Sequence, residues 1–167
     1  MARTIILGLG NGLLSNDAVG LIAVDQLAKM VQRPELDFKT SEKSGLNLID
    51  SVAGYDHAII IDAILSGQNP PGAIIEFSLD DLPPNPKLRS PHDADFKSSI
   101  ELGRQAGLKM PQDVSIFGIE IVDNLTFSPN LSTELIDKLP SILIKLIEKN
   151  TSCSWQSLSL DYGSLSH

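Results

Sequence analysis

The sequence is poor in several residue types that define common classes of protein. Its 167 residues include one cysteine, Cys153, so an intrachain disulfide and a cysteine metal cluster are excluded. No Gly-x-Ser-x-Gly elbow occurs, and a serine or cysteine hydrolase is disfavoured. No apolar run approaches the roughly 18 residues of a membrane-spanning helix, and the N-terminus lacks the regions of a signal peptide. We therefore expect a cytoplasmic protein that does not associate with a membrane.

Positive charge is also scarce. The chain has 13 lysines and arginines against 21 aspartates and glutamates, a formal net charge of −8 at pH 7 and a pI of about 4.7. This charge would repel a phosphate backbone, so we expect no nucleic-acid partner. The same charge favours solubility and a cationic segment on a protein partner, and it does not bear on the fold.

What the sequence does contain is an alternation of short apolar runs with amphipathic segments. This alternation predicts an α/β fold, a three-layer sandwich in which a twisted, mainly parallel sheet of about five strands carries helices on both faces. Residues 1–149 would form a single α/β catalytic domain, and residues 150–167 a serine-rich C-terminal tail. Pro140 should kink the last helix or split it in two. We expect strands over 4–7, 36–40, 57–63, 72–79 and 114–121, and helices over 16–31, 45–53, 94–106 and 132–149.

A glycine-rich turn follows the first expected strand. Residues 8–13 (GLGNGL) differ from a dinucleotide-binding fingerprint because Leu13 replaces the third glycine, and no P-loop lysine follows. Nucleotide binding is therefore disfavoured. We interpret the turn as a tight connection between a strand and a helix, and we expect Ser15 or Asn16 to cap that helix. The turn then fixes where the helix begins and so where Asp17 lies.

Asp17 and Asp62 are the most informative side chains. Both should lie at or just beyond the carboxyl ends of parallel strands, where open α/β sheets bind their ligands. If the two strands are neighbours, a spacing of about 5 Å could bring both carboxylates within reach of one ion. Asp62 follows an apolar run, and a buried carboxylate needs hydrogen bonds, a charged partner or a metal. The alternative is that each aspartate only caps a helix or bonds the local backbone.

The chain has three histidines, and His92 is the best placed of them for a site. His57 should begin a strand, and His167 is the last residue. His92 follows Pro91 in a proline-rich loop over 80–93, which can fold over the edge where Asp62 lies, although a loop histidine is often only exposed. Two carboxylates and one imidazole would form an open three-ligand site for a divalent transition metal.

Three blocks of the sequence resemble the hydrogenase maturation endopeptidases, which trim the C-terminus of the large subunit of nickel–iron hydrogenases. The blocks are residues 8–20 (GLGNGLLSNDAVG), 59–63 (IIIDA) and 90–92 (SPH), and the similarity in order and spacing extends over residues 3–149. The resemblance implies an α/β sandwich and a nickel-responsive site. By matching positions, the catalytic and metal-binding residues fall on Asp17, Asp62 and His92.

The resemblance also implies an activity. The chain would be an endopeptidase that removes a C-terminal peptide from the nickel-loaded large-subunit precursor, with the nickel carried by that client protein. The three ligands would test whether nickel has been inserted, and the bound ion would hold the scissile segment and polarise its carbonyl group or a water. The carboxylates could instead act as a general base. We expect the chain itself to be a monomer.

The chain departs from this family at two places. Asn16 stands where a second acid is usual, and residues 40–45 (TSEKSG) keep only the final glycine of an Asp-Gly-Gly block. The second departure leaves open a non-proteolytic, metal-sensing protein that binds the hydrogenase precursor without cutting it. A peptidyl-tRNA hydrolase has a similar opening, but the net charge of −8 and the absence of a histidine shortly after the turn disfavour it.

Overall fold

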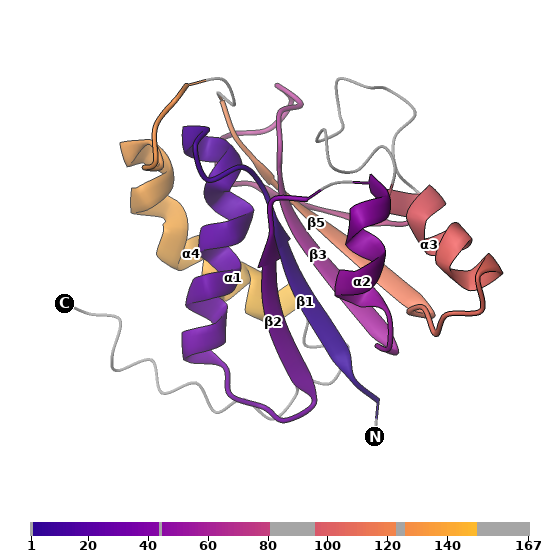
Figure 1. Ribbon diagram of the computed structural model, residues 1–167. Coiled ribbons are helices and arrows are strands. Elements are labelled where there is room, and N and C mark those ends of the chain that lie inside the picture. The colour runs from indigo at the N-terminus through magenta and orange to yellow at the C-terminus, as the bar shows by residue number, and fades with distance from the viewer. Residues whose placement is uncertain (1, 44, 81–95, 123–125, 150–167) are drawn as a thin grey trace.

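Five strands form a single sheet in the computed structural model, which describes residues 2–43, 45–80, 96–122 and 126–149 (Figure 1). The strand order is β2-β1-β3-β5-β4. β1 pairs in parallel with β2 and β3, β3 pairs in parallel with β5, and β4 runs antiparallel to β5. The expected mainly parallel sheet is confirmed. Its strands are β1 (Thr4–Leu9), β2 (Leu36–Ser41), β3 (His57–Ile64), β4 (Ile74–Ser78) and β5 (Asp113–Glu120).

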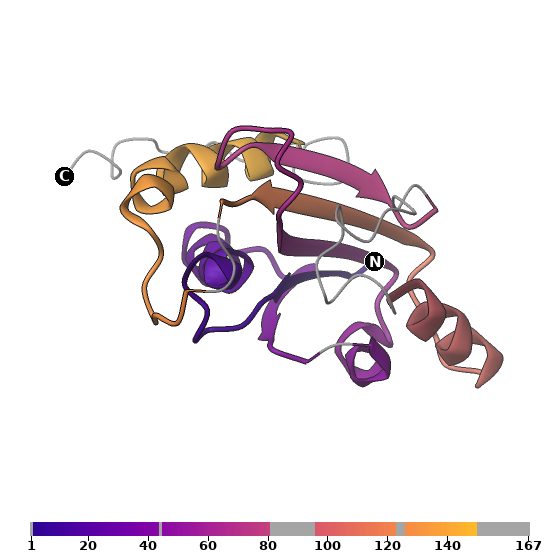
Figure 2. The same cartoon turned by 90° about the horizontal axis from the view of Figure 1, so that it is seen from above.

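Helices cover both faces of the sheet, so the expected three layers are also confirmed. Figure 2 shows α1 and α4 on one face and α2 and α3 on the other. A 3-10 helix precedes α1, and another precedes α2. The helices are η1 (Ser15–Ala18), α1 (Val19–Met30), η2 (Gly45–Leu48), α2 (Ile49–Val52), α3 (Phe96–Gln105) and α4 (Thr133–Lys149).

Alternate side chains of the strands fill two apolar cores, one under each layer of helices. Ile6 and Ile59 pack with α1 and α4, whereas Ile5 and Ile60 pack with α2 and α3. β3 is buried from its second residue onward because helices cover both of its faces and β1 and β5 flank it. This burial explains why β3 reads as an unbroken apolar run in the sequence rather than as an alternating one.

Two glycines let α1 approach the sheet closely. A Cβ on Gly8 would lie 2.4 Å from the carbonyl oxygen of Gly20, and a Cβ on Gly20 would lie 2.5 Å from the carbonyl oxygens of Leu9 and Ile61. These separations are shorter than a carbon–oxygen contact allows, and each involves backbone atoms. The first turn of α1 is therefore seated on the carboxyl ends of β1 and β3.

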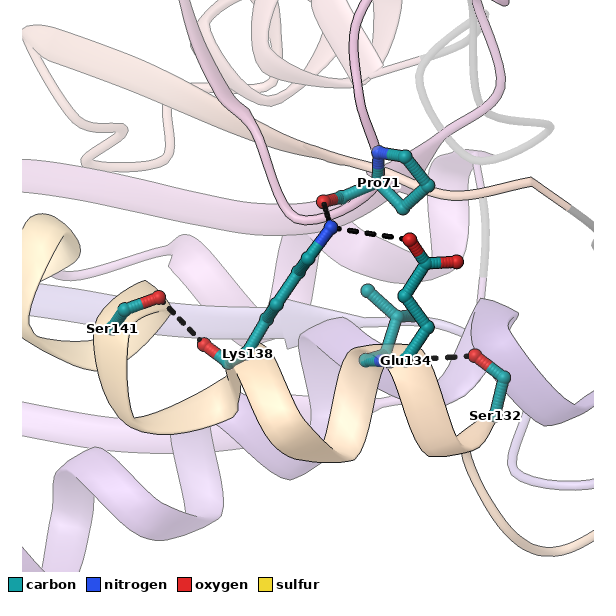
Figure 3. A network of polar contacts seen from close by, with 6 residues as sticks. Pro71, Ser132, Glu134, Lys138 and Ser141 are labelled. Carbon is teal, nitrogen blue, oxygen red and sulfur yellow. Dashed lines mark hydrogen bonds and ion pairs between the residues drawn. The ribbon is translucent and has the colours of Figure 1, made fainter.

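α4 continues through Pro140 as one helix, so of the two expected effects of this proline, a kink or a split, the split does not occur. Figure 3 shows how its first half is anchored: Lys138 Nζ donates a hydrogen bond to the Pro71 carbonyl at 2.8 Å and forms an ion pair with Glu134 at 3.2 Å. The hydroxyl of Ser141 donates to the Lys138 carbonyl at 2.9 Å. Ser141 directly follows Pro140, which has no amide hydrogen to donate. The Lys138–Pro71 hydrogen bond joins α4 to the turn between β3 and β4.

The predicted serine-rich tail over 150–167 lies outside the described residues. Within the described ranges, no helix is both long enough and apolar enough to cross a lipid bilayer.

Candidate active site

Asp17 lies in η1, where the chain turns from β1 into α1. The residue is 5% exposed, and its Oδ2 accepts a hydrogen bond from the Asn11 amide at 2.9 Å. The carbonyl oxygen of Asp17 packs against Gly10, where a Cβ would lie only 2.3 Å away. The glycine-rich turn thus folds around Asp17, in agreement with the interpretation that the glycines position this carboxylate.

Asp62 lies near the carboxyl end of β3 and is fully buried. Its Oδ1 accepts a hydrogen bond from the amide of Ala63 at 2.8 Å. β1 and β3 are neighbours in the sheet, as the sequence argument required, and η1 contacts β3. A Cβ on Gly20, in the first turn of α1, would lie 3.2 Å from the Cα of Asp62. The two carboxylates are therefore brought to the same edge of the sheet from adjoining elements.

The expected helix caps at Ser15 and Asn16 are wrong. Neither η1 nor α1 has a side-chain cap, because both polar side chains bond instead to the segment 128–132 that leads into α4. Ser15 Oγ donates to the Asn130 carbonyl at 2.9 Å, and Asn16 Oδ1 accepts from the Ser132 amide at 2.8 Å. Ser15 has a φ of 28°, a strained value for a residue with a side chain. These distant contacts hold the turn in place.

Glu42 holds the turn from its other side. This residue follows β2, and its Oε1 accepts a hydrogen bond from the Gly12 amide at 2.6 Å. Glu42 belongs to the block over 40–45 that departs from the family pattern, and its hydrogen bond to the glycine-rich turn was not predicted. The interaction spans 30 residues, so only the adjacency of β1 and β2 could have suggested it.

Glu120 is a further buried carboxylate that the sequence argument missed. It ends β5 and is 1% exposed, and both of its oxygens accept hydrogen bonds. Oε1 accepts from the amides of Ser66 and Gly67 at 2.9 Å each, and Oε2 accepts from the Ser66 hydroxyl at 2.7 Å. The signal that identified Asp62, an acid at the end of an apolar run, applied here too. With three donors bound to it, Glu120 fixes the loop after β3.

The third predicted ligand, His92, lies outside the described residues. Among the residues that are described, no three histidine, cysteine or acidic side chains gather into a metal site. The carboxylates of Asp17 and Asp62 supply the hard oxygen donors that suit a divalent cation, and one imidazole would complete a donor set suited to nickel. The three-residue site remains a prediction.

The fold and the buried carboxylates define a class, the α/β sandwiches that bind their ligand at the carboxyl edge of a mainly parallel sheet. Comparison with known proteins identifies the family within this class. Residues 23–149 match the hydrogenase maturation protease family (HycI), and the chain belongs to that family. It is accordingly a peptidase.

Individual relatives agree with this assignment. The chain is 26% identical over 152 residues to the hydrogenase 2 maturation protease of Escherichia coli (strain K12), a match that covers 87% of this chain and 92% of that protein. Its fold is similar to the hydrogenase maturating endopeptidase HybD from E. coli, with a TM-score of 0.72, 22% identity, and 91% and 94% of the two chains covered. The maturation protease HybD from Thermococcus kodakarensis gives a TM-score of 0.65 at 26% identity, covering 88% and 97%.

Proposed function

We propose that this protease removes a C-terminal peptide from the nickel-loaded large-subunit precursor of a nickel–iron hydrogenase, acting as a cytoplasmic monomer. The observation that carries the proposal is the arrangement of Asp17 and Asp62. Both carboxylates are buried, Asp17 in η1 after β1 and Asp62 near the carboxyl end of the neighbouring β3, on the edge where α/β proteins bind ligands. The family supplies the reaction class, and the carboxylates supply groups that can perform it.

The chemistry required is hydrolysis of one peptide bond. In this proposal Asp17, Asp62 and His92 bind the nickel ion that the precursor presents, which selects precursor that has already received its metal. Such an ion polarises a carbonyl group or lowers the pKa of a water. The carboxylates can alternatively take the proton from the attacking water as general base. In both versions the amine of the released peptide receives a proton and the new carboxylate stays on the large subunit.

The test is a mass measurement on the large subunit after incubation with the purified protease. Nickel-loaded precursor should lose its C-terminal peptide, and precursor prepared without nickel should keep its mass. Asp17→Asn and Asp62→Asn should each lower the cleavage rate by at least about 100-fold, because a neutral amide is a poor base and a weak metal ligand. Asp25→Asn, an exposed aspartate on α1, should cleave like the wild type.

The departure at residues 40–45 favours one competing function, a non-proteolytic protein that binds the precursor. An unchanged large-subunit mass together with a stable, nickel-dependent complex would support that function and contradict the protease. Wild-type rates from both Asp17→Asn and Asp62→Asn would instead show that the site lies elsewhere.

A further inference from the structure

Large exposed apolar side chains are concentrated at the carboxyl edge of the sheet. Single exposed apolar residues are common on soluble proteins, but a group of them on one edge marks a binding surface. Leu13, Leu65 and Val122 lie just beyond the ends of β1, β3 and β5, and Phe127 lies further along the segment after β5. Phe127 is 79% exposed, the highest value among the large apolar residues that the structure describes.

Backbone hydrogen bonds hold Leu13 and Phe127 beside each other. Leu14 and Ser128 form an isolated parallel bridge, in which the Ser128 amide donates to the Leu13 carbonyl at 2.9 Å and the Ser15 amide donates to the Ser128 carbonyl at 2.8 Å. Leu13 immediately precedes the bridge residue Leu14, and Phe127 immediately precedes its partner Ser128. In parallel register such residues occupy neighbouring positions on one face. We call this pair the Leu13–Phe127 platform.

The platform is continuous with the candidate site. Leu13 belongs to the same turn as Asn11, whose amide binds the Asp17 carboxylate, and η1 begins two residues after it. The Ser15–Asn130 and Asn16–Ser132 hydrogen bonds fix the segment that carries Phe127 against the residues around Asp17. Leu13 lies four residues before Asp17, so residues that flank a peptide bond bound at Asp17 can reach the platform.

We propose that the Leu13–Phe127 platform binds apolar side chains of the precursor's C-terminal segment next to the scissile bond. This inference rests on the proposed function, since it assigns part of the substrate's binding energy to the platform. Backbone hydrogen bonds hold the two segments together before binding, so their backbone loses little conformational freedom when the peptide covers the platform. The platform accordingly contributes to how tightly the precursor binds, while the buried carboxylates bind its nickel ion and set how fast its peptide bond is cleaved.

The experiment compares Phe127→Ser and Leu13→Ser with Leu108→Ser. Leu108 is 45% exposed and follows α3, near the amino ends of β3 and β5, so it is a matched control at the opposite edge. Initial cleavage rates are measured against the concentration of nickel-loaded precursor. We expect Phe127→Ser to raise KM about tenfold with kcat within about twofold of the wild type, as for an anchoring aromatic residue. Phe127→Leu should recover most of the loss, and Leu108→Ser should change neither constant.

A direct binding measurement separates failure of the platform from failure of the proposed function. Asp17→Asn, which should cleave at least about 100-fold more slowly, serves as the common background, so its weaker metal binding is the same in every variant. Each serine substitution is combined with it, and the affinity for the intact precursor is compared with that of Asp17→Asn alone. If the wild type does not cleave, the protease proposal fails, and the binding series still tests the platform. Equal behaviour of Phe127→Ser, Leu13→Ser and Leu108→Ser would overturn the platform. A wild-type dimer in sedimentation that Phe127→Ser dissociates would overturn it too, because the platform would then bind a second copy of the chain.

Discussion

At the scale of single residues, two consecutive amides of the glycine-rich turn donate to two different carboxylates. The Asn11 amide binds Asp17 and the Gly12 amide binds Glu42. Asp17 is buried and Glu42 is exposed, so the turn connects the candidate site with the surface beyond β2. Glu42, in the block that departs from the family pattern, is thereby linked through the turn to Asp17, which matches that pattern.

Glu42 is expected to act as a positioning residue. Glu42→Ala removes the acceptor of the Gly12 amide, and we expect kcat/KM for the nickel-loaded precursor to fall about three- to tenfold, as for an exposed hydrogen bond to a charged group. Glu42→Gln keeps an oxygen acceptor and should recover most of the activity. Lys43→Ala, the exposed neighbour, is the control. An Ala variant as active as the wild type would show that the turn holds Asp17 without Glu42.

At the scale of elements, the approach of α1 to the sheet sets the geometry of the site. η1 and α1 follow each other directly, so any movement of α1 away from β1 and β3 also moves Asp17 away from Asp62. Gly20 controls this approach because the two strands' carbonyl oxygens occupy the space where its side chain would lie. Backbone atoms cannot move aside as a flexible side chain can.

Gly20→Ala should therefore destabilise the protein by about 2–3 kcal/mol, although alanine alone would favour the helix by up to about 1 kcal/mol. Gly103→Ala in α3 is the matched control, because the added Cβ would meet the sulfur of Met110, 2.6 Å away, which belongs to a flexible side chain. We expect that variant to lose less than about 1 kcal/mol. Urea unfolding of the two variants gives both values, and equal losses would contradict this account of α1.

At the scale of the whole molecule, a polar cluster at the amino edge, far from the site, joins β2 to the segment before β1 and to the segment between α2 and β3. Asp37 on β2 accepts a hydrogen bond from the Tyr55 hydroxyl at 2.8 Å and forms an ion pair with Arg3, which precedes β1. The Tyr55 hydrogen bond, and then Arg3, lower the pKa of the Asp37 carboxyl below its ordinary value of 3.8. Arg3 also lies 5.1 Å above the Tyr55 ring.

The lowered pKa of Asp37 makes the stability that this cluster contributes depend on pH. Because the folded pKa of Asp37 lies below the ordinary value of 3.8, its contribution to the free energy of unfolding is complete well above pH 4 and is lost as the pH falls through the folded pKa. Asp37→Asn should therefore be less stable than the wild type at pH 7, and this difference should shrink steadily below about pH 4. Chemical unfolding across pH 2.5 to about 7 measures it, and Tyr55→Phe should show a weaker form of the same trend. A difference independent of pH would contradict this assignment.

Local pattern was enough to predict most of the elements and the places of Asp17 and Asp62 in the fold. The apolar run before Asp62 identified the central strand, and the glycines identified the turn before Asp17. The errors concern interactions between distant segments. Ser15 and Asn16 have the chemistry of caps, but they bond to residues more than a hundred positions away, which outcompete the local amides. The order of the strands, the antiparallel direction of β4 and the partner of Glu42 likewise depend on contacts that periodicity does not encode.

The bridge between Leu14 and Ser128 has a consequence for how the protein is made. The hydrogen bond from Ser15 to Asn130 closes a loop of 115 residues. The two segments that meet at the bridge, one around Leu14 and one around Ser128, are therefore far apart in the sequence. On a ribosome, the first half emerges long before the second, and closing so large a loop comes late in folding. The nascent chain therefore lacks a finished binding edge until the segment around Ser128 has been synthesised, and it cannot cut its substrate before that point.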